Sequence, residues 1–136
     1  MPRTTRDGLE FGPNDSGKLY MSMNYHRGTR NPNKSTWHQD FKPQEEYELF
    51  DRGDRDAWRC ARGHQWGIAE DGSRRLGSGG ERVSFCPMNE NLTVPWHGYP
   101  VFAEGAYKVP EEVIAIWEDG CVVGRITAKR LRRESI

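Results

Sequence analysis

Cysteine and histidine residues in two short stretches have the types and spacing of metal ligands. Cys60 and His64 stand four positions apart in CARGH, and Cys86 opens a second stretch, CPMN. Thiolate and imidazole both bind zinc, and one tight turn can direct both groups at the same ion. Gly63 supports such a turn, because glycine adopts left-handed backbone angles without steric cost. These residues therefore indicate a candidate zinc site built from two turns.

The stretch WRCARGHQW, followed by CPMN, resembles the small zinc-ribbon modules written W-x-C-x-x-G-H-x-W … C-P-x-C. The resemblance covers about residues 57–89 and departs at the last ligand, where Asn89 stands in place of cysteine. A neutral amide oxygen is a weak ligand for zinc. We expect His97 to complete the site, with Cys121 and then Glu90 as the next candidates.

The resemblance implies two zinc-ribbon-like hairpins held by one structural zinc ion. Modules of this kind usually serve as binding modules, often in proteins that handle nucleic acid. We expect no catalytic role for the metal, because no obvious general base stands beside the motif. The residues leave a metal-free alternative open, in which Cys60 and Cys86 are small buried hydrophobic residues and the His64 side chain caps its own turn.

A second group of polar residues lies earlier in the chain and has the composition of a phosphate-handling site. Within fifteen residues the sequence holds His26, Arg27, Arg30, His38 and Asp40. A histidine beside an acid can transfer protons, and arginine binds phosphate. This stretch therefore predicts, as an alternative, a small enzyme that acts on a phosphate or nucleotide through His26, Arg27 and His38. A polar loop without catalytic function is the other interpretation.

Acidic and basic residues balance over the whole chain but separate along it. The 136 residues carry 20 basic and 20 acidic side chains, for a net charge of zero. Residues 40–56 hold seven acids and three bases, whereas residues 125–136 hold five bases and one acid. This arrangement predicts either two solvated faces or a polarised surface that orients a partner.

A proline-bounded aromatic loop, residues 95–100, adds a candidate contact surface. Rigid turns of this type present aromatic rings, which dominate the binding energy of many interfaces. The alternative is that the rings hold the loop against the core. The candidate partner-binding residues are Trp96 and Tyr99 in this loop, Glu45, Glu46 and Glu48 in the acidic segment, and Arg130, Arg132 and Arg133 near the C-terminus.

The charge balance favours a protein partner over nucleic acid, because domains that bind nucleic acid are usually basic. We therefore expect a non-enzymatic macromolecule-binding protein, such as a small inhibitor, an immunity protein or a phage-type accessory protein. A nucleic-acid-binding zinc-ribbon protein is the alternative. Three cysteines and a start without an apolar segment predict a reducing, cytoplasmic location. No apolar run is long enough to cross a membrane, so no membrane partner is expected.

The elements that would position these residues are short and joined by turns. Fifteen glycines, eight prolines and a mean hydropathy of −0.92 favour a compact core and many loops. Alternation of apolar and polar residues predicts strands at 18–26, 45–50 and 82–86, and two short strands on either side of residues 61–63. Residues 51–56 have the composition of a turn.

The C-terminal segment has helical spacing instead. Pro110, followed by two glutamates, predicts a helix over residues 109–120 that ends at Gly120. A second helix is predicted over residues 122–134. Its apolar stripe would consist of Val123, Thr127 and Leu131, with Ile126 beside them.

We therefore expect one α+β domain over residues 1–136. It would contain a small, mostly antiparallel β-sheet with zinc-ribbon-like hairpins and a C-terminal helical hairpin. The expected division is a flexible arm at 1–17, a β-rich part at 18–108 and the helical hairpin at 109–136.

Overall fold

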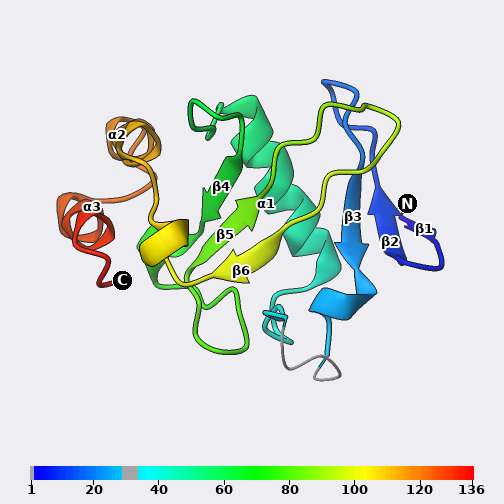
Figure 1. Ribbon diagram of the computed structural model, residues 1–136, viewed down its shortest axis with the longest axis horizontal. Helices are drawn as coiled ribbons and strands as arrows, with labels where there is room; N and C mark the ends of the chain where they lie inside the picture. Colours follow the sequence, from blue (N-terminus) through cyan, green and yellow to red (C-terminus); the bar gives the residue numbers. More distant parts are fainter. Residues whose placement is uncertain (1, 29–33) are drawn as a thin grey trace.

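A computed structural model describes residues 2–28 and 34–136 and has an α+β fold (Figure 1). Its described part contains two three-stranded antiparallel sheets. The first sheet has the order β1 (Arg3–Thr4), β2 (Gly8–Phe11) and β3 (Tyr20–Met23). The second has the order β4 (Gln65–Ile68), β5 (Val83–Cys86) and β6 (Tyr99–Val101). The α-helices are α1 (Pro43–Arg55), α2 (Glu111–Asp119) and α3 (Arg125–Arg132). The predicted fold class is confirmed.

A parallel bridge joins the two sheets. The amide of Met21 donates to the carbonyl of Trp96 at 2.7 Å, and the amide of Trp96 donates to the carbonyl of Leu19 at 2.8 Å. β3 therefore runs parallel to the chain that enters β6. The two strands then diverge (Figure 1), and a cleft lies in the space between them.

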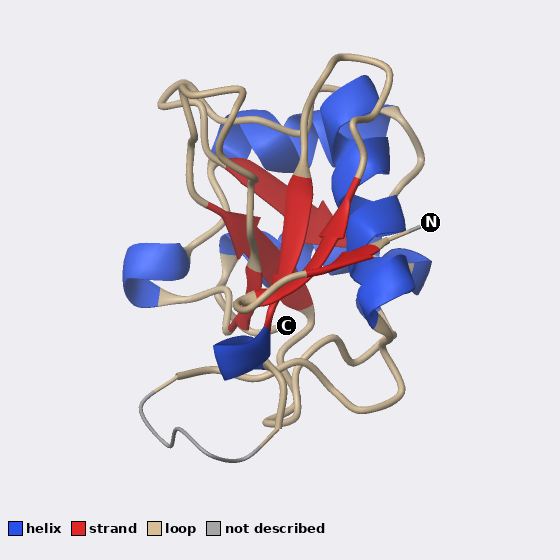
Figure 2. Cartoon of the chain, turned by 90° about the vertical axis from the view of Figure 1, so that its right-hand side faces the viewer, coloured by secondary structure: helices blue, strands red, loops and turns tan. Residues whose placement is uncertain are grey.

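Helix α1 packs against both sheets on one side of the strands (Figure 2). The ring of Phe50 lies against Tyr20 of β3, with 5.1 Å between the centroids. The carbonyl of Phe50 accepts a 2.7 Å hydrogen bond from the side chain of Gln65 in β4. Leu49 approaches Gly67 so closely that a Cβ at this glycine would lie 3.1 Å from the leucine. Through these contacts α1 fixes the relative position of the two sheets.

The hairpin of α2 and α3 covers part of the opposite face of the second sheet. Side chains from β4 and β5 form one core cluster with the buried residues of both helices. Trp117 of α2 packs edge-on against Trp58, with 5.9 Å between ring centroids. Figure 1 shows the two helices side by side and nearly end-on, as in a helical hairpin. Thr127 and Leu131 are buried as predicted, but Ile126 is 72% exposed, because it lies on the opposite side of α3.

The strand predicted at 45–50 and the turn predicted at 51–56 are wrong, because residues 45–55 belong to α1 and Asp56 is its C-cap. Pro43 occupies the start of the helix, where its missing amide hydrogen costs nothing. The buried positions of α1 recur at helical spacing, but they include the acids Glu46 and Asp54. A search for apolar periodicity therefore misses this helix.

Residues 1–17, expected to be a flexible arm, instead contain β1 and β2. β2 pairs with β3 in antiparallel register, with Phe11 opposite Tyr20. The ring of Phe11 also stacks on Tyr47 of α1, with 5.2 Å between centroids. The segment is held by this aromatic residue and by polar contacts, since the side-chain amide of Asn14 donates to Asp54 of α1 at 2.9 Å.

The other predicted strands are either confirmed or present in a shorter form. The strand at 18–26 is β3, and it ends in a 3-10 turn at Asn24–His26. The strand at 82–86 is confirmed as β5. Of the two short strands predicted on either side of residues 61–63, the second is β4. The first forms only a single bridge to it, between Arg59 and Gln65. Among the described residues, no helix is both long and apolar enough to cross a membrane.

Candidate functional site

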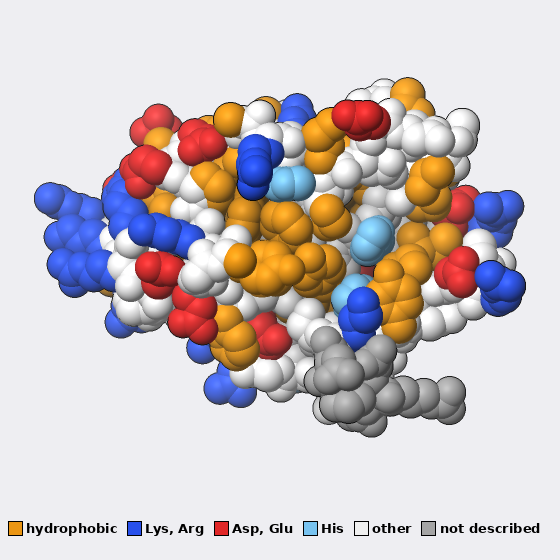
Figure 3. All heavy atoms as spheres, in the orientation of Figure 1, with side chains coloured by type: hydrophobic (Ala, Val, Ile, Leu, Met, Phe, Trp, Pro, Cys, Tyr) orange, Lys and Arg blue, Asp and Glu red, His pale blue; other side chains and the backbone are white. Residues whose placement is uncertain are grey.

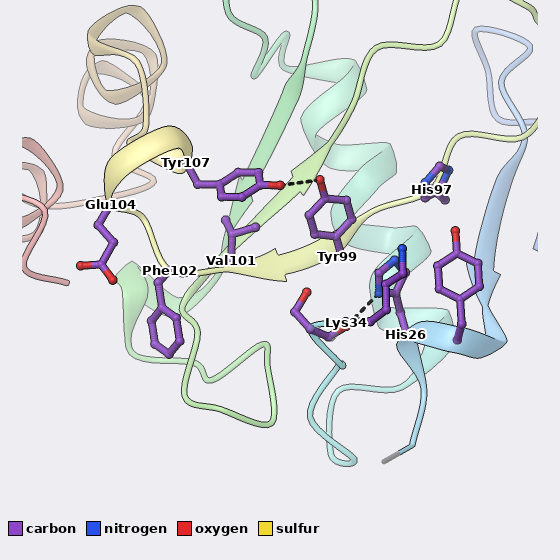
Figure 4. A pocket seen from close by; sticks show the side chains of 10 residues that line it. His26, Lys34, His97, Tyr99, Val101, Phe102, Glu104 and Tyr107 are labelled. Carbon is purple, nitrogen blue, oxygen red and sulfur yellow. Dashed lines mark hydrogen bonds between the residues drawn. The ribbon is translucent and has the colours of Figure 1, made fainter. Parts of the chain in front are cut away.

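A cleft of about 550 Å³ lies where β3 and β6 diverge (Figure 4). Its lining comes from segments that are far apart in the sequence: the 3-10 turn at Asn24–His26, residues 34 and 35, the chain from 97 to 104, and the 3-10 turn at Gly105–Tyr107. Figure 3 shows hydrophobic and histidine side chains together on this face of the molecule. The cleft is thus assembled only by the fold.

A backbone hydrogen bond fixes the tautomer of the neutral His26 ring. Its Nδ1 lies 2.8 Å from the carbonyl oxygen of Ser35. Because a carbonyl only accepts, Nδ1 donates this hydrogen bond, and Nε2 of the neutral ring keeps a lone pair. The ring stacks on Tyr99, with 5.1 Å between centroids. Burial lowers the pKa of His26, and the charges of His97 and Lys34 lower it further, against the effect of the Ser35 hydrogen bond.

His97 lines the same cleft from the segment that leads into β6 (Figure 4). Burial lowers the pKa of this imidazole, and the nearby charge of Lys34 lowers it too. Both cleft histidines are therefore neutral at neutral pH. Neutral imidazoles can accept as well as donate hydrogen bonds, so they suit a polar ligand that carries no strong charge at this point.

Aromatic side chains form the floor of the cleft. The hydroxyls of Tyr99 and Tyr107 lie 2.9 Å apart and share a hydrogen bond. Both rings pack edge-on against Phe85 of β5, at 5.8 Å and 5.3 Å. Burial raises the pKa of Tyr99, and the bond to Tyr107 raises it further, so the hydroxyl stays protonated. The floor is apolar with one neutral polar spot.

The rim of the cleft carries exposed aromatic residues and two opposite charges. Tyr25 is 40% exposed and Phe102 is 50% exposed. The ammonium group of Lys34 lies 5.2 Å from the centroid of the Tyr25 ring. Lys34 and Glu104 stand at opposite ends of the cleft (Figure 4). The rim thus offers apolar contact area between one cation and one anion.

A buried carboxylate anchors the turn that carries His26. Glu46 of α1 is 2% exposed. It accepts hydrogen bonds from Tyr20 at 2.8 Å, from Ser22 at 2.6 Å and from Nε of Arg27 at 2.8 Å. Burial raises the pKa of Glu46, while the charge of Arg27 and the hydroxyl donors oppose this rise. Because Arg27 follows His26 directly, this network ties one wall of the cleft to α1.

The two turns predicted to bind zinc do lie side by side. The amide of Met88 donates to Nδ1 of His64 at 3.0 Å, and Gln65 pairs with Cys86 across β4 and β5. However, Cys86 packs in the core cluster on the α1 side, whereas Cys60 packs against the cluster on the α2 side.

The further zinc candidates are spread over the surface and the cleft. His97 faces the cleft, and Cys121 is exposed in the turn between α2 and α3. Glu90 lies exposed in the loop before β6, where Asn89 donates to the carbonyl of Val94 at 2.6 Å. In the described ranges no three His, Cys, Asp or Glu side chains are grouped so that they could hold a metal. Zinc binding stays a prediction.

The predicted partner-binding residues occupy different environments. Tyr99 lines the cleft, but Trp96 is buried beside Phe50 rather than presented to a partner. Glu46 is buried, which removes it from the acidic surface. Glu45 accepts a hydrogen bond from Arg74 at 3.1 Å.

The rest of the predicted contact residues lie on the surface. Glu48, Arg130 and Arg133 are exposed. Arg132 is held by Glu111 at 2.8 Å and by Glu118 at 3.2 Å. Arg132 therefore acts within the hairpin, and its neighbours remain for an outside partner.

The structure brings only two of the three predicted catalytic residues together. Arg27 and His38 both line a neighbouring hollow of about 460 Å³, where Arg27 is bound to Glu46, whereas His26 lines the cleft. His38 Nδ1 is 3.7 Å from a carboxylate oxygen of Asp40. Arg30 lies outside the described residues.

The sequence does not mark Tyr25, which was expected only as part of a strand. It also does not mark the cleft residues Lys34, Phe102, Glu104 and Tyr107. They belong to irregular segments without periodicity or motif, so no signal along the chain marks them. Comparison with known proteins finds no match to this chain among family models, curated proteins or solved structures.

Proposed function

We propose that this chain is a non-enzymatic binding protein that holds an extended segment of a protein partner in the cleft. The observation that carries the proposal is the pair of exposed rim aromatics, Tyr25 and Phe102, beside an aromatic floor. Burial of such rings in a complex removes a large apolar area from water, and aromatic anchors dominate many protein interfaces.

The charges at the cleft support a protein segment over nucleic acid at this site. Lys34 and Glu104 stand at opposite ends, and the two histidines, which lie toward the Lys34 end (Figure 4), are neutral at neutral pH. Phosphate binding requires an excess of positive charge, which one cation and one anion do not supply. A peptide that carries charges of both signs is complementary to this arrangement.

The positions of the polar groups also support binding over catalysis. Arg27 and His38 line a hollow other than the cleft that holds His26, and the guanidinium of Arg27 is already bonded to Glu46. The three residues expected to act together on a phosphate therefore do not share one site. The three cysteines form no disulfide with one another, which agrees with the cytoplasmic location that we include in the proposal.

The expected occupant has three features that follow from the cleft. A basic side chain would lie near Glu104, an apolar or aromatic side chain would pack between Phe102 and the Tyr99–Tyr107 floor, and an acidic group would lie near Lys34 (Figure 4). Backbone carbonyls and amides of the segment can bond the neutral imidazoles, which both donate and accept.

Selection from a library of displayed random peptides on the immobilised chain tests the proposal. We expect enriched peptides to combine a basic residue with an aromatic or aliphatic one. Synthetic copies of these peptides should bind at least about fivefold more weakly to Phe102→Ala and Tyr25→Ala, because each loses an anchor worth more than about 1 kcal/mol. A Glu104→Lys variant should reverse the preference for a basic residue.

Leu92→Ala provides the matched control, since Leu92 is an exposed apolar residue (58%) that does not line the cleft. Binding of the same peptides should be unchanged by this substitution. Peptides that bind equally well to the wild type and to both aromatic variants would show that the cleft is not the contact surface, and the proposal would be withdrawn.

A further inference from the structure

Helix α3 presents a strip of positive charge on its outer side. Arg125, Lys129, Arg130 and Arg133 are all exposed. At 3.6 residues per turn these positions fall within about 140° of arc around the helix axis. Figure 3 shows Lys and Arg side chains gathered at the end of the molecule where Figure 1 places α3. We call these four residues the α3 basic face.

The buried side of α3 lies opposite this face and holds the helix firmly. Thr127, Ala128 and Leu131 are buried against the core. Arg132 bonds Glu111 and Glu118 of α2, which anchors the two helices to each other. The α3 basic face is therefore presented on a docked helix.

Four acids next to α3 are already engaged. Glu111 and Glu118 pair with Arg132, Glu134 accepts a 2.7 Å hydrogen bond from the amide of Gly105, and Asp71 accepts one at 2.8 Å from the amide of Gly124. Within the ranges that the structure describes, none of the four residues of the α3 basic face forms an ion pair. Their charge is available to a partner, although the whole chain is neutral.

We propose that the α3 basic face binds the phosphate backbone of double-stranded DNA, as a second surface beside the cleft. From Arg125 to the C-cap residue Arg133 the chain rises about 12 Å. The B-DNA major groove is about 12 Å wide and admits an α-helix, so basic side chains spaced over this length can reach phosphates on both sides of the groove. Three of the four cations are arginines, whose planar guanidinium groups can bond phosphate oxygens in pairs.

Ile126 distinguishes this partner from others. It lies within the arc of the four cations and is 72% exposed. A side chain in this place would face base edges between phosphates, where an apolar contact with thymine methyl groups is favourable. A single exposed isoleucine gives too little apolar area for membrane binding. Duplex RNA fits less well, because its major groove is narrow and deep.

Binding of a fluorescein-labelled 20-base-pair DNA of mixed sequence, followed by anisotropy, tests this inference on the whole chain. Four phosphate contacts give a slope of about −3.6 for log K against log salt, so binding should weaken about 150-fold between 50 and 200 mM NaCl. The double variant Lys129→Gln/Arg130→Gln should bind more weakly and lower the slope by about 1.8.

Arg52→Gln/Arg55→Gln is the charge-matched control. It removes the same charge from α1, where Arg52 pairs with the C-cap residue Asp56 and Arg55 pairs with Asp51. This control and the cleft variant Phe102→Ala should keep the wild-type slope and affinity, so the outcome is independent of the proposed peptide binding. Circular dichroism of each variant verifies the fold.

Two results would overturn the inference. Equal loss of DNA binding in the α3 variant and the α1 control would show that net charge alone is responsible. Equally tight binding of poly-glutamate and DNA would assign the α3 basic face to acidic protein surfaces instead.

Discussion

At the scale of single residues, Glu46 is the group on which the cleft wall depends most. Its carboxylate bonds two hydroxyls of β3 and the guanidinium of Arg27, all in a position 2% exposed to solvent. A buried charge is tolerated only when it is paired and hydrogen-bonded. Loss of this charge affects β3, the His26 turn and α1 together.

Glu46→Gln should therefore lower the free energy of unfolding by about 3 kcal/mol, because it leaves the Arg27 charge without its partner. Glu48→Gln, an exposed change on the same helix, should alter it by less than about 0.5 kcal/mol. Urea unfolding of both variants measures the difference. Similar effects of the two substitutions would contradict the assigned role of Glu46.

The two cleft histidines make stability depend on pH. Their pKa values lie below 6.5 in the folded chain, because burial disfavours the charged ring. Below pH 6.5 the unfolded state then binds more protons than the folded state, so stability is complete above about pH 6.5 and falls as the pH drops through the lowered pKa values.

Urea unfolding at pH 7.5 and 5.5 checks this dependence. The loss of stability between the two pH values should be smaller in His26→Gln/His97→Gln than in the wild type. Phe102→Ala changes the cleft without removing a histidine and should keep the wild-type loss. An unchanged loss in the double histidine variant would assign the dependence to other groups.

At the scale of elements, patterning succeeded where apolar residues form the buried stripe. The helices at α2 and α3 follow from Pro110, two glutamates and an apolar stripe, and both are confirmed. Helix α1 differs, because its buried positions mix the acids Glu46 and Asp54 with the aromatic Phe50. Apolar periodicity does not indicate a helix whose buried side includes hydrogen-bonded acids.

Leu131 and Ile126 separate the inner and outer sides of α3. Leu131→Ala should cost about 3 kcal/mol, because it leaves a cavity in the core beneath the helix. Ile126→Ala should change stability by less than about 0.5 kcal/mol, since this side chain is largely in solvent. Equal losses in urea unfolding would mean that α3 docks in another orientation.

At the scale of the whole molecule, α1 joins the two sheets into one cooperative structure. Its residues contact β3 on one side and β4 on the other, and the Trp96 bridge adds a direct link between the sheets. If α1 detached from one sheet, it would leave the apolar residues that it covers on both sheets exposed to water. This arrangement explains why two sheets of three short strands each hold together.

Urea unfolding should therefore be a single transition. Tryptophan fluorescence reports on both core clusters, because Trp96 lies in one and Trp58 in the other. This signal should coincide with far-ultraviolet circular dichroism. Phe50→Ala should shift both signals to lower urea by the same amount, and two separated transitions would show that the sheets unfold independently.

By itself the sequence determined the α+β class, the C-terminal hairpin and the strand at β5. These features follow from local backbone preferences and from apolar residues at regular spacing. The tertiary structure alone decided that His26, Lys34, His97 and Phe102 share one cleft and that Glu46 is buried. The physical reason is that the divergence of β3 from β6 brings together irregular segments, and the position of such segments depends on packing against distant parts of the chain.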